Sequence, residues 1–173
     1  MKVLLTGSSK GIGYKIAKDL LAEEHELALH YNKNESPLDA LLKKDKTGSF
    51  SIQADLSQQQ EIKKMVVNTI DKLSFPDCII NNAGIAESAD ISIDTNNWTK
   101  IFDKTIDVNL KAPSIIFKEF LKHKREKKIN SRLRIINIAS RAAFRGEQQD
   151  YISYACSKAV SYTHLTLPTI ALV

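Results

Sequence analysis

The segment TGSSKGIG at residues 6–13 most constrains what this chain can fold into. It follows a short apolar run at residues 3–5 and precedes a stretch whose apolar residues have helical spacing. A strand, a glycine turn and a helix in this order can bind phosphate, because the glycines permit a tight turn and the helix presents unpaired N–H groups. The spacing of Gly7, Gly11 and Gly13 therefore predicts a dinucleotide phosphate site. The alternative is a glycine turn that binds no ligand.

Strand-like and helix-like segments alternate along the rest of the chain. We expect strands at residues 2–6, 26–31, 49–53, 78–80 and 133–139. We expect helices at residues 11–24, 37–44, 58–73 and 96–123, with a last one from residue 151. Ser57 is predicted to cap the third helix, with Gln60 completing a capping box, and Pro113 to kink or break the fourth. The alternation predicts a doubly wound α/β fold, in which helices cover both faces of a parallel sheet to make three layers.

The composition limits the function classes. The chain has 173 residues, 43% hydrophobic and 26% charged, which fits one globular domain. No apolar stretch has the length of a membrane span and no signal peptide is recognisable, so we expect a cytoplasmic protein with no membrane partner. Cys78 and Cys156 are predicted to be buried free thiols, and the scattered histidines indicate no metal site.

A basic segment raises the question of nucleic acid binding. The net charge is +5, and much of the excess comes from Lys122, Lys124, Arg125, Lys127, Lys128, Arg132 and Arg134. This segment contains Glu126 and no aromatic residue, and it lies between a predicted helix and a predicted strand. We therefore interpret it as a solvated helix end and expect no nucleic acid partner.

Polar residues and glycine follow several of the predicted strands. NNAG occupies residues 81–84, Ser140 follows the fifth strand, and Asp55 and Leu56 follow the third. Ligands of doubly wound sheets bind at the carboxyl ends of the strands, where the winding reverses. We therefore expect these segments, the glycine turn and the start of the last helix to lie along one edge of the sheet.

Tyr154 and Lys158 are four residues apart in the last predicted helix and so share a face. A phenol has an ordinary pKa of about 10, and a nearby ammonium stabilises the phenolate and lowers that pKa. The pair therefore predicts a general acid and base. Tyr151 lacks such a partner, because residue 155 is alanine. The alternative is a tyrosine and a lysine on a helix surface.

Several motifs together resemble the short-chain dehydrogenase/reductase family. They are TGSSKGIG at residues 6–13, NNAG at 81–84, DVNLKAP at 107–113, IINIAS at 135–140 and YACSK at 154–158. The resemblance extends over residues 1–160 and implies a Rossmann-type fold. Within the family the sequence is most similar to 3-oxoacyl-[acyl-carrier-protein] reductases and related NADPH-dependent carbonyl reductases. This implies reduction of a small-molecule carbonyl, such as a 3-oxoacyl thioester carried on acyl carrier protein, to a secondary alcohol.

The resemblance implies catalytic roles for four residues. Ser140 would hydrogen-bond the substrate carbonyl oxygen, and Tyr154 would donate a proton to it as hydride arrives from the nicotinamide. Lys158 would also hold the nicotinamide ribose, and Asn109 would order a water that continues the proton relay. A capping or helix-kinking role for Asn109 is the alternative and is compatible with this one.

The resemblance also implies a nicotinamide cofactor. An acid at the end of the second strand usually marks an NAD site, but here the strand ends in HYNK and no acid precedes Glu35. Lys10 and Lys33 could meet a 2′-phosphate, or they could be ordinary solvated lysines; we predict NADP(H) over NAD(H). The expected cofactor-binding residues are Gly7, Ser9, Lys10, Gly11, Ile12, Gly13, Tyr31, Asn32, Lys33, Asp55, Leu56, Asn82, Ala83, Gly84, Tyr154 and Lys158.

The last residues depart from the family pattern. In relatives, which are homo-oligomeric at full length, the tyrosine-bearing helix continues and two more strands follow. Here residues 161–173 read SYTHLTLPTIALV, in which Pro168 would break a helix. We expect residues 1–160 to form an incomplete NAD(P)-binding domain with an exposed fifth strand, and residues 161–173 to be a non-native tail. A nucleotide-binding or regulatory protein that has lost catalysis is the alternative function.

Overall fold

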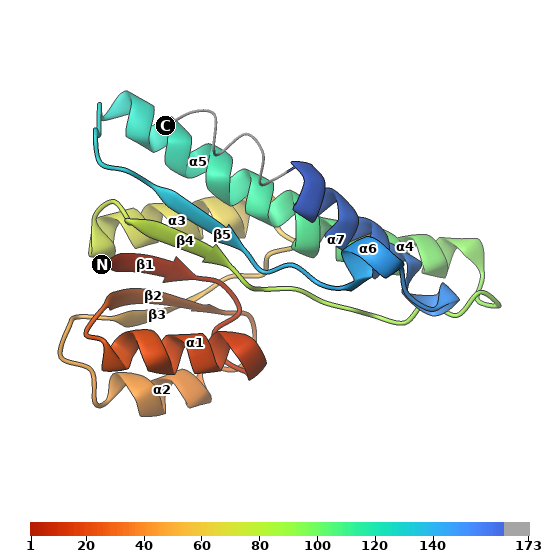
Figure 1. Ribbon diagram of the computed structural model, residues 1–173, viewed down its shortest axis with the longest axis horizontal. Coiled ribbons are helices and arrows are strands. Elements are labelled where there is room, and N and C mark those ends of the chain that lie inside the picture. The colour runs from red at the N-terminus through yellow and green to blue at the C-terminus, as the bar shows by residue number, and fades with distance from the viewer. Residues whose placement is uncertain (165–173) are drawn as a thin grey trace.

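The computed structural model describes residues 1–164, and Figure 1 shows their arrangement. Five parallel strands form one sheet in the order β3-β2-β1-β4-β5. They are β1 (Lys2–Leu5), β2 (Glu26–Tyr31), β3 (Phe50–Gln53), β4 (Cys78–Asn81) and β5 (Arg134–Asn137). The chain moves outward from β1 to β3 and then returns to place β4 on the other side of β1. This reversal confirms the doubly wound parallel sheet.

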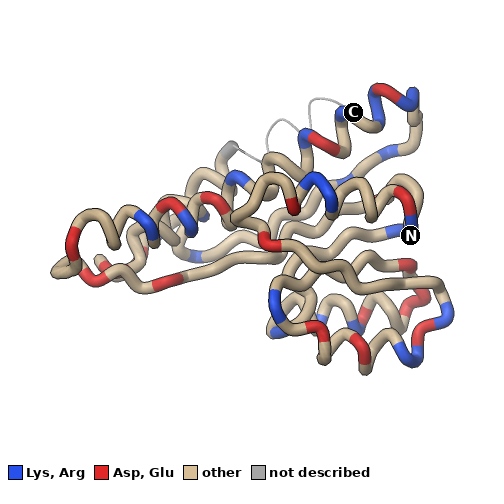
Figure 2. Tube along the Cα trace, turned by 180° about the vertical axis from the view of Figure 1, so that it is seen from behind, with Lys and Arg blue, Asp and Glu red and all other residues tan. Residues whose placement is uncertain are grey.

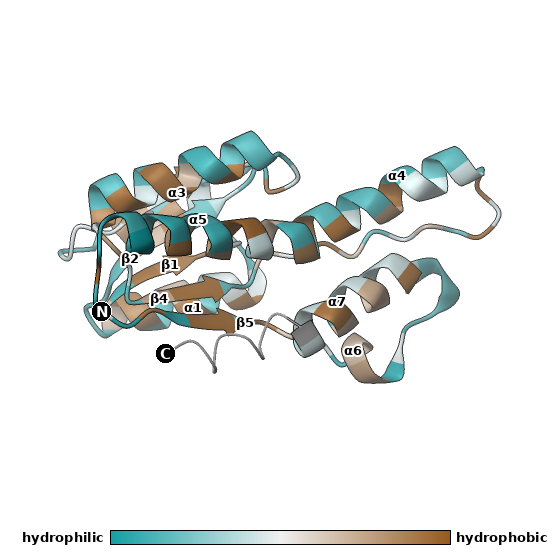
Figure 3. Ribbon diagram, turned by 90° about the horizontal axis from the view of Figure 1, so that it is seen from above, coloured by the Kyte–Doolittle hydropathy of each residue, from teal (hydrophilic) through white to brown (hydrophobic). Residues whose placement is uncertain are grey.

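Helices cover both faces of the sheet (Figure 1). One face carries α1 (Gly11–Ala22) and α2 (Ser36–Leu42), and the other carries α3 (Gln59–Leu73) and α5 (Ala112–Glu126). The remaining helices are α4 (Thr95–Ile106), a π-helix (Asp107–Lys111), α6 (Ala142–Arg145), a 3₁₀ turn (Gln149–Tyr151) and α7 (Ile152–His164). The predicted three-layer arrangement is therefore present, with α4, α6 and α7 extending beyond the carboxyl ends of the strands (Figures 1 and 3).

The core has two halves, one on each face of the sheet. Leu4 and Ile79 point toward α3 and α5 and pack with Phe120, whereas Leu5 and Leu29 point toward α1 and α2. These strands read as continuous apolar runs because successive side chains alternate between two buried faces. Figure 3 shows the result as hydrophobic strands between amphipathic helices.

The long helical region around Pro113 is continuous but not uniformly α-helical. A π-helix over Asp107–Lys111 joins α4 to α5, and Pro113 lies in the first turn of α5. Proline has no N–H, so it leaves the carbonyl of Asn109, four residues earlier, without its usual donor. The Ser161 Oγ donates to that carbonyl at 3.2 Å. The predicted interruption thus takes the form of a π-helical turn just before the proline.

Two sequence predictions about single residues are wrong. Ser57 does not cap α3: its N–H and Oγ both donate to the Asp55 carboxylate, and the helix begins two residues later. Cys78 is buried as expected, but Cys156 is exposed, because the face of α7 that contacts the π-helix carries Ser153 and Ser157 instead. The short helix α6 was not predicted, since four residues are too few to show a helical period.

β5 is the edge of the sheet within residues 1–164, as the sequence predicts. Its Ile136 side chain is 46% exposed, whereas Ile80 of the neighbouring β4 is 8% exposed. The sequence proposal of a non-native tail at residues 161–173 falls mostly on residues 165–173, which lie outside the described part.

The basic segment lies at the free end of α5 and in the loop that follows (Figure 2). Lys122, Arg125, Lys127 and Lys128 are exposed there, and Lys122 pairs with Glu126 at 3.8 Å. Cationic side chains at a helix C-terminus are stabilised by the helix dipole. This arrangement agrees with the prediction of a solvated helix end.

Candidate active site

The glycine turn after β1 is closed tightly against the loop after β4. Gly7 has a φ of +67°, and a Cβ added there would lie 2.8 Å from the Ala83 Cα. A Cβ at Gly13 would lie 2.2 Å from the Gly7 carbonyl oxygen and 2.4 Å from the Asn82 Nδ2. At these two positions only glycine fits without moving the backbone.

Hydrogen bonds of Thr6, which follows β1, and of Asn82, which follows β4, hold the glycine turn against the loop after β4. The Asn82 Nδ2 donates to the carbonyls of Thr6 and Gly7, each at 3.0 Å. The Thr6 Oγ1 accepts from the N–H of Asn82 at 3.1 Å and of Ala83 at 3.0 Å. Thr6 was not among the predicted site residues, although it begins the glycine segment. The expected residues Gly7, Gly13, Asn82 and Ala83 are thus brought together.

The open part of the turn has the features of an anion site. A Cβ at Gly11 would meet nothing within 4 Å, and Ile12 is 65% exposed. Lys10 precedes α1 in an extended conformation, and no side chain caps the helix. The first N–H groups of this helix are therefore available to a phosphate, as at other helix N-termini. A tight glycine cradle beside an uncapped helix fits the pyrophosphate of a nicotinamide dinucleotide.

The loops after β2 and β3 lie beside this turn, since β1, β2 and β3 are neighbours. Asn32 and Lys33 are exposed after β2, and Leu56 is buried after β3. The Asp55 Oδ1 is engaged by the Ser57 N–H at 2.9 Å and the Ser57 Oγ at 2.8 Å, which fixes the orientation of this carboxylate. Tyr31 is half-buried and hydrogen-bonded to Glu35.

The second half of the site is built on the π-helix and α7. Asn109 is 3% exposed, and its Nδ2 donates to the Ile85 carbonyl at 2.8 Å and to the Ser157 Oγ at 3.0 Å. Its Oδ1 accepts from the Ile85 N–H at 2.8 Å. The amide of Asn109 therefore holds both the loop after β4 and α7. Its partner on α7, Ser157, was not among the predicted site residues.

The Lys158 side chain, on α7, lies close to Asn109 and to the loop after β4. Its Nζ donates to the Ile138 carbonyl at 3.0 Å and lies 5.9 Å from the centroid of the Tyr154 ring. A Cβ at Gly84 would lie 3.7 Å from this Nζ and 3.3 Å from the Asn109 Oδ1. Burial lowers the pKa of Lys158 from its ordinary value. Gly84, Asn109, Tyr154 and Lys158 are thus brought together beside the glycine turn.

Ser140 lies on the segment that follows β5, two residues after the carbonyl that Lys158 contacts. Its Oγ accepts from the Ala142 N–H at 3.2 Å, at the start of α6. In the described part of the chain, no hydrogen bond joins Ser140 to Tyr154. Ser140 is therefore near Lys158 because it follows Ile138 in the chain, and not because its side chain contacts Tyr154.

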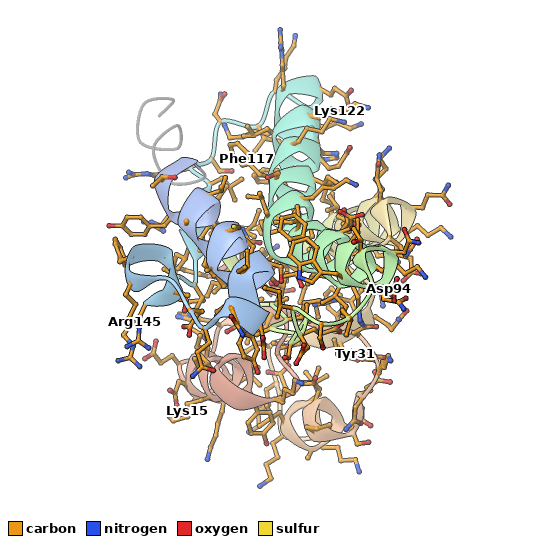
Figure 4. The ribbon with its side chains drawn as sticks, turned by 90° about the vertical axis from the view of Figure 1, so that its right-hand side faces the viewer. Lys15, Tyr31, Asp94, Phe117, Lys122 and Arg145 are labelled. Carbon is orange, nitrogen blue, oxygen red and sulfur yellow. The ribbon has the colours of Figure 1, made fainter. Side chains whose placement is uncertain are left out.

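Figure 4 views the molecule from the end that carries α4, α6 and α7. Lys15 on α1 and Arg145 on α6 point outward from the molecule in this view.

Residues 1–164 contain no group of three or more His, Cys, Asp or Glu side chains that could hold a metal ion. Over the same residues, no helix is both long and apolar enough to cross a membrane.

A protein-family model described as short chain dehydrogenase matches residues 1–166. The chain belongs to this family. Among its relatives is the 3-oxoacyl-[acyl-carrier-protein] reductase FabG of Staphylococcus epidermidis, 32% identical over 113 residues, which are 63% of this chain and 45% of that protein. The L-fucose dehydrogenase of Mus musculus is 29% identical over 156 residues, which are 90% of this chain and 54% of that protein. The chain thus spans about half the length of these relatives.

Two solved structures have the same architecture. A 4-hydroxyisoleucine dehydrogenase complexed with NADH has a TM-score of 0.78 at 29% identity, over 92% of this chain and 62% of that one. A blue fluorescent protein from a metagenomic library, in complex with NADPH, has a TM-score of 0.74 at 26% identity, over 92% of this chain and 63% of that one. Two proteins in complex with a nicotinamide cofactor, one with NADH and one with NADPH, therefore share this fold.

Proposed function

We propose that this protein is an NADP(H)-dependent oxidoreductase that reduces the keto group of a 3-oxoacyl thioester or a similar carbonyl to a secondary alcohol. One observation carries the proposal: the loop after β4 contacts both halves of the site. Ala83 closes on Gly7 of the glycine turn, and Gly84, the next residue, faces Asn109 and the Lys158 Nζ. A dinucleotide on the glycine turn would therefore extend along this loop toward Tyr154 and Lys158.

A nicotinamide cofactor, when bound, supplies the hydride for such a reduction. The residues that would hold it are Gly7, Ser9, Lys10, Gly11, Ile12 and Gly13 at the phosphates, Tyr31, Asn32, Lys33, Asp55 and Leu56 at the adenosine, and Asn82, Ala83, Gly84, Tyr154 and Lys158 toward the nicotinamide. The cradle around Gly13 and the uncapped start of α1 support the first group. The Lys158 Nζ beside Gly84 supports the last.

The chemistry of the chain itself is proton transfer to the substrate oxygen. The Tyr154 phenol would donate the proton, and the Ser140 hydroxyl would hydrogen-bond the same oxygen as charge develops there. The Lys158 ammonium, already held by the Ile138 carbonyl, would stabilise the negative charge left on Tyr154. Asn109, fixed by its three side-chain hydrogen bonds, would order the water that returns a proton.

The NADP(H) preference rests on the end of β2. Asn32 and Lys33 follow Tyr31 and are exposed, and Lys10 is exposed at the start of α1. The first acid of this segment, Glu35, is engaged by the Ser51 Oγ and the Tyr31 hydroxyl. These hydrogen bonds lower the pKa of Glu35, so its carboxylate stays ionised. The carboxylate accepts hydrogen bonds from Ser51 and Tyr31 and is not free to bind a ribose. The ammonium groups of Lys10 and Lys33 could then bind a 2′-phosphate.

Three measurements on the purified protein test this proposal. Calorimetric titration with NADPH and NADH should give the tighter binding for NADPH, and tighter binding of NADH would overturn the cofactor preference. NADPH oxidation should be detected with a short 3-oxoacyl thioester or a comparable ketone. A protein that binds NADPH but oxidises it with none of these substrates would favour the nucleotide-binding protein without catalysis. The same thioester presented on acyl carrier protein tests the carrier, since a higher kcat/KM would support it.

A further inference from the structure

His30 is a buried histidine that connects two loops of the cofactor site. Its side chain lies on β2 and the residue is 2% exposed. The Nδ1 accepts a hydrogen bond from the Gly7 N–H at 3.0 Å, and the Nε2 contacts the Ala54 carbonyl at 2.9 Å. Gly7 belongs to the glycine turn, and Ala54 precedes Asp55 at the end of β3. One imidazole thus bridges the phosphate side and the adenosine side.

These two contacts permit only one form of the imidazole. A backbone N–H can only donate and a carbonyl can only accept, so Nδ1 must be unprotonated and Nε2 must carry the hydrogen. The other neutral tautomer would make both contacts repulsive, and the imidazolium would face the Gly7 N–H with a second N–H. Burial lowers the pKa of His30, whereas its bond to Ala54 and the nearby Asp55 carboxylate act in the opposite direction. The neutral form is therefore the form that the fold holds.

The backbone of His30 supports the same turn. Its carbonyl accepts from the Ser8 N–H at 2.9 Å and from the Ser8 Oγ at 2.8 Å. Gly7 is consequently fixed at three points: its N–H by His30, its Cα against Ala83 and its carbonyl by Asn82. Of these, only the His30 contact comes from the β2 side.

We propose that His30 is a positioning residue for dinucleotide binding, which sets the orientation of the Gly7 peptide through its neutral Nε2–H tautomer. The proposal rests on the proposed function, because it assigns the glycine turn to the cofactor phosphates. Without His30, the Gly7 N–H would need another hydrogen-bond acceptor, and the turn would change its position to find one. His30 itself need not contact the cofactor.

Replacement of His30 tests this role. His30→Phe keeps an aromatic ring but removes both hydrogen bonds, and we expect the Kd for NADPH to rise about tenfold. His30→Asn offers an acceptor near the place of Nδ1 and should recover most of the affinity. Leu27→Val, at another buried position of β2, is the matched control and should leave the Kd unchanged. Denaturant unfolding of all three variants shows whether stability alone accounts for the change.

Nuclear magnetic resonance gives a readout that does not depend on activity or on folding of a variant. The ¹⁵N shifts of His30 in the unmodified protein should show an unprotonated Nδ1 and a protonated Nε2 at neutral pH, and the Gly7 amide should exchange slowly with solvent. The opposite tautomer, or equal NADPH affinity in His30→Phe and the unmodified protein, would overturn the role of His30 alone. Absence of any NADPH or NADH binding by the unmodified protein would overturn the proposed function as well.

Discussion

The two halves of the site are held in different ways. The half on β1, β2 and β4 is surrounded by buried side chains. Its turn is fixed by hydrogen bonds that the Thr6 and His30 side chains accept and that the Asn82 side chain donates. The half on β5, α6 and α7 lies at the sheet edge, where Ile136 is 46% exposed and Phe144 69% exposed. The Asn109 side chain links α7 to the loop after β4, and the Lys158 Nζ links α7 to the segment after β5.

This difference separates binding from catalysis. The glycine turn is fixed by contacts that involve neither α6 nor α7, so changes in those helices that leave Tyr154 and Lys158 in place should have little effect on cofactor affinity. Tyr154 and Ser140, in contrast, depend on the position of α7 and of the segment after β5. Catalysis should therefore be lost more easily than binding, and the following variants test that separation.

Gly13→Ala should give the largest effect on binding. The added Cβ would overlap the Gly7 carbonyl and the Asn82 side chain, so the turn must open. We expect a loss of NADPH affinity of at least about a hundredfold and a loss of about 2 kcal/mol in the free energy of unfolding. Gly146→Ala is the control, because φ there is +72°, so an alanine is strained, but nothing lies within 4 Å and NADPH affinity should not change. Equal NADPH affinities for the two variants would show that the close packing around Gly13 is not needed for NADPH binding.

Ser157→Ala should damage catalysis more than binding. It removes the hydrogen bond from the Asn109 Nδ2 and the one that the Ser157 Oγ donates to the Tyr154 carbonyl. We expect kcat to fall about tenfold and the free energy of unfolding by about 1 kcal/mol, with the Kd for NADPH unchanged. Cys156→Ala, at the exposed neighbouring position, should change none of these. A matching loss of NADPH affinity in Ser157→Ala would show that the two halves are not separable.

Lys33→Ala tests the cofactor preference. If Lys33 meets the 2′-phosphate, the Kd for NADPH should rise about fivefold at low salt while the Kd for NADH stays constant. Lys15→Ala is the control, since Lys15 points outward from α1 and pairs with Asp19 (Figure 4). An unchanged ratio of the two affinities in Lys33→Ala would remove Lys33 from the site.

The pH dependence of stability tests the burial of Lys158. Because the folded-state pKa of Lys158 is below its ordinary value of 10.5, the unfolded chain holds more protons between the two values. Stability should therefore rise with pH in the alkaline range up to about 10.5. Urea unfolding at several pH values should show this rise in the unmodified protein relative to Lys158→Met, which has no amine to titrate. Parallel curves for the two proteins would show that Lys158 is not desolvated in the fold.

The sequence predicted residues in both halves of the site and missed others in each half. The glycine spacing and the apolar run before it are local patterns, and the structure brings Gly7, Gly13, Asn82 and Ala83 together. Thr6 and His30 were missed because their roles are hydrogen bonds between neighbouring strands, which no periodic pattern reveals. Ser57 was misassigned because the nearby Asp55 carboxylate takes its hydrogen bonds. Ser157 could have been suspected only from its position one turn after Ser153 on the face that meets the π-helix.

The central claim is that a dinucleotide cradle and a proton-donating tyrosine lie at one edge of the sheet and act on one substrate. Tyr154→Phe tests it most directly, with NADPH binding by calorimetry and NADPH oxidation with a 3-oxoacyl thioester measured on the same preparation. We predict a loss of turnover of about a thousandfold. The Kd for NADPH should change by no more than about threefold, because the glycine turn that would hold the phosphates is intact. Turnover equal to that of the unmodified protein would contradict the account.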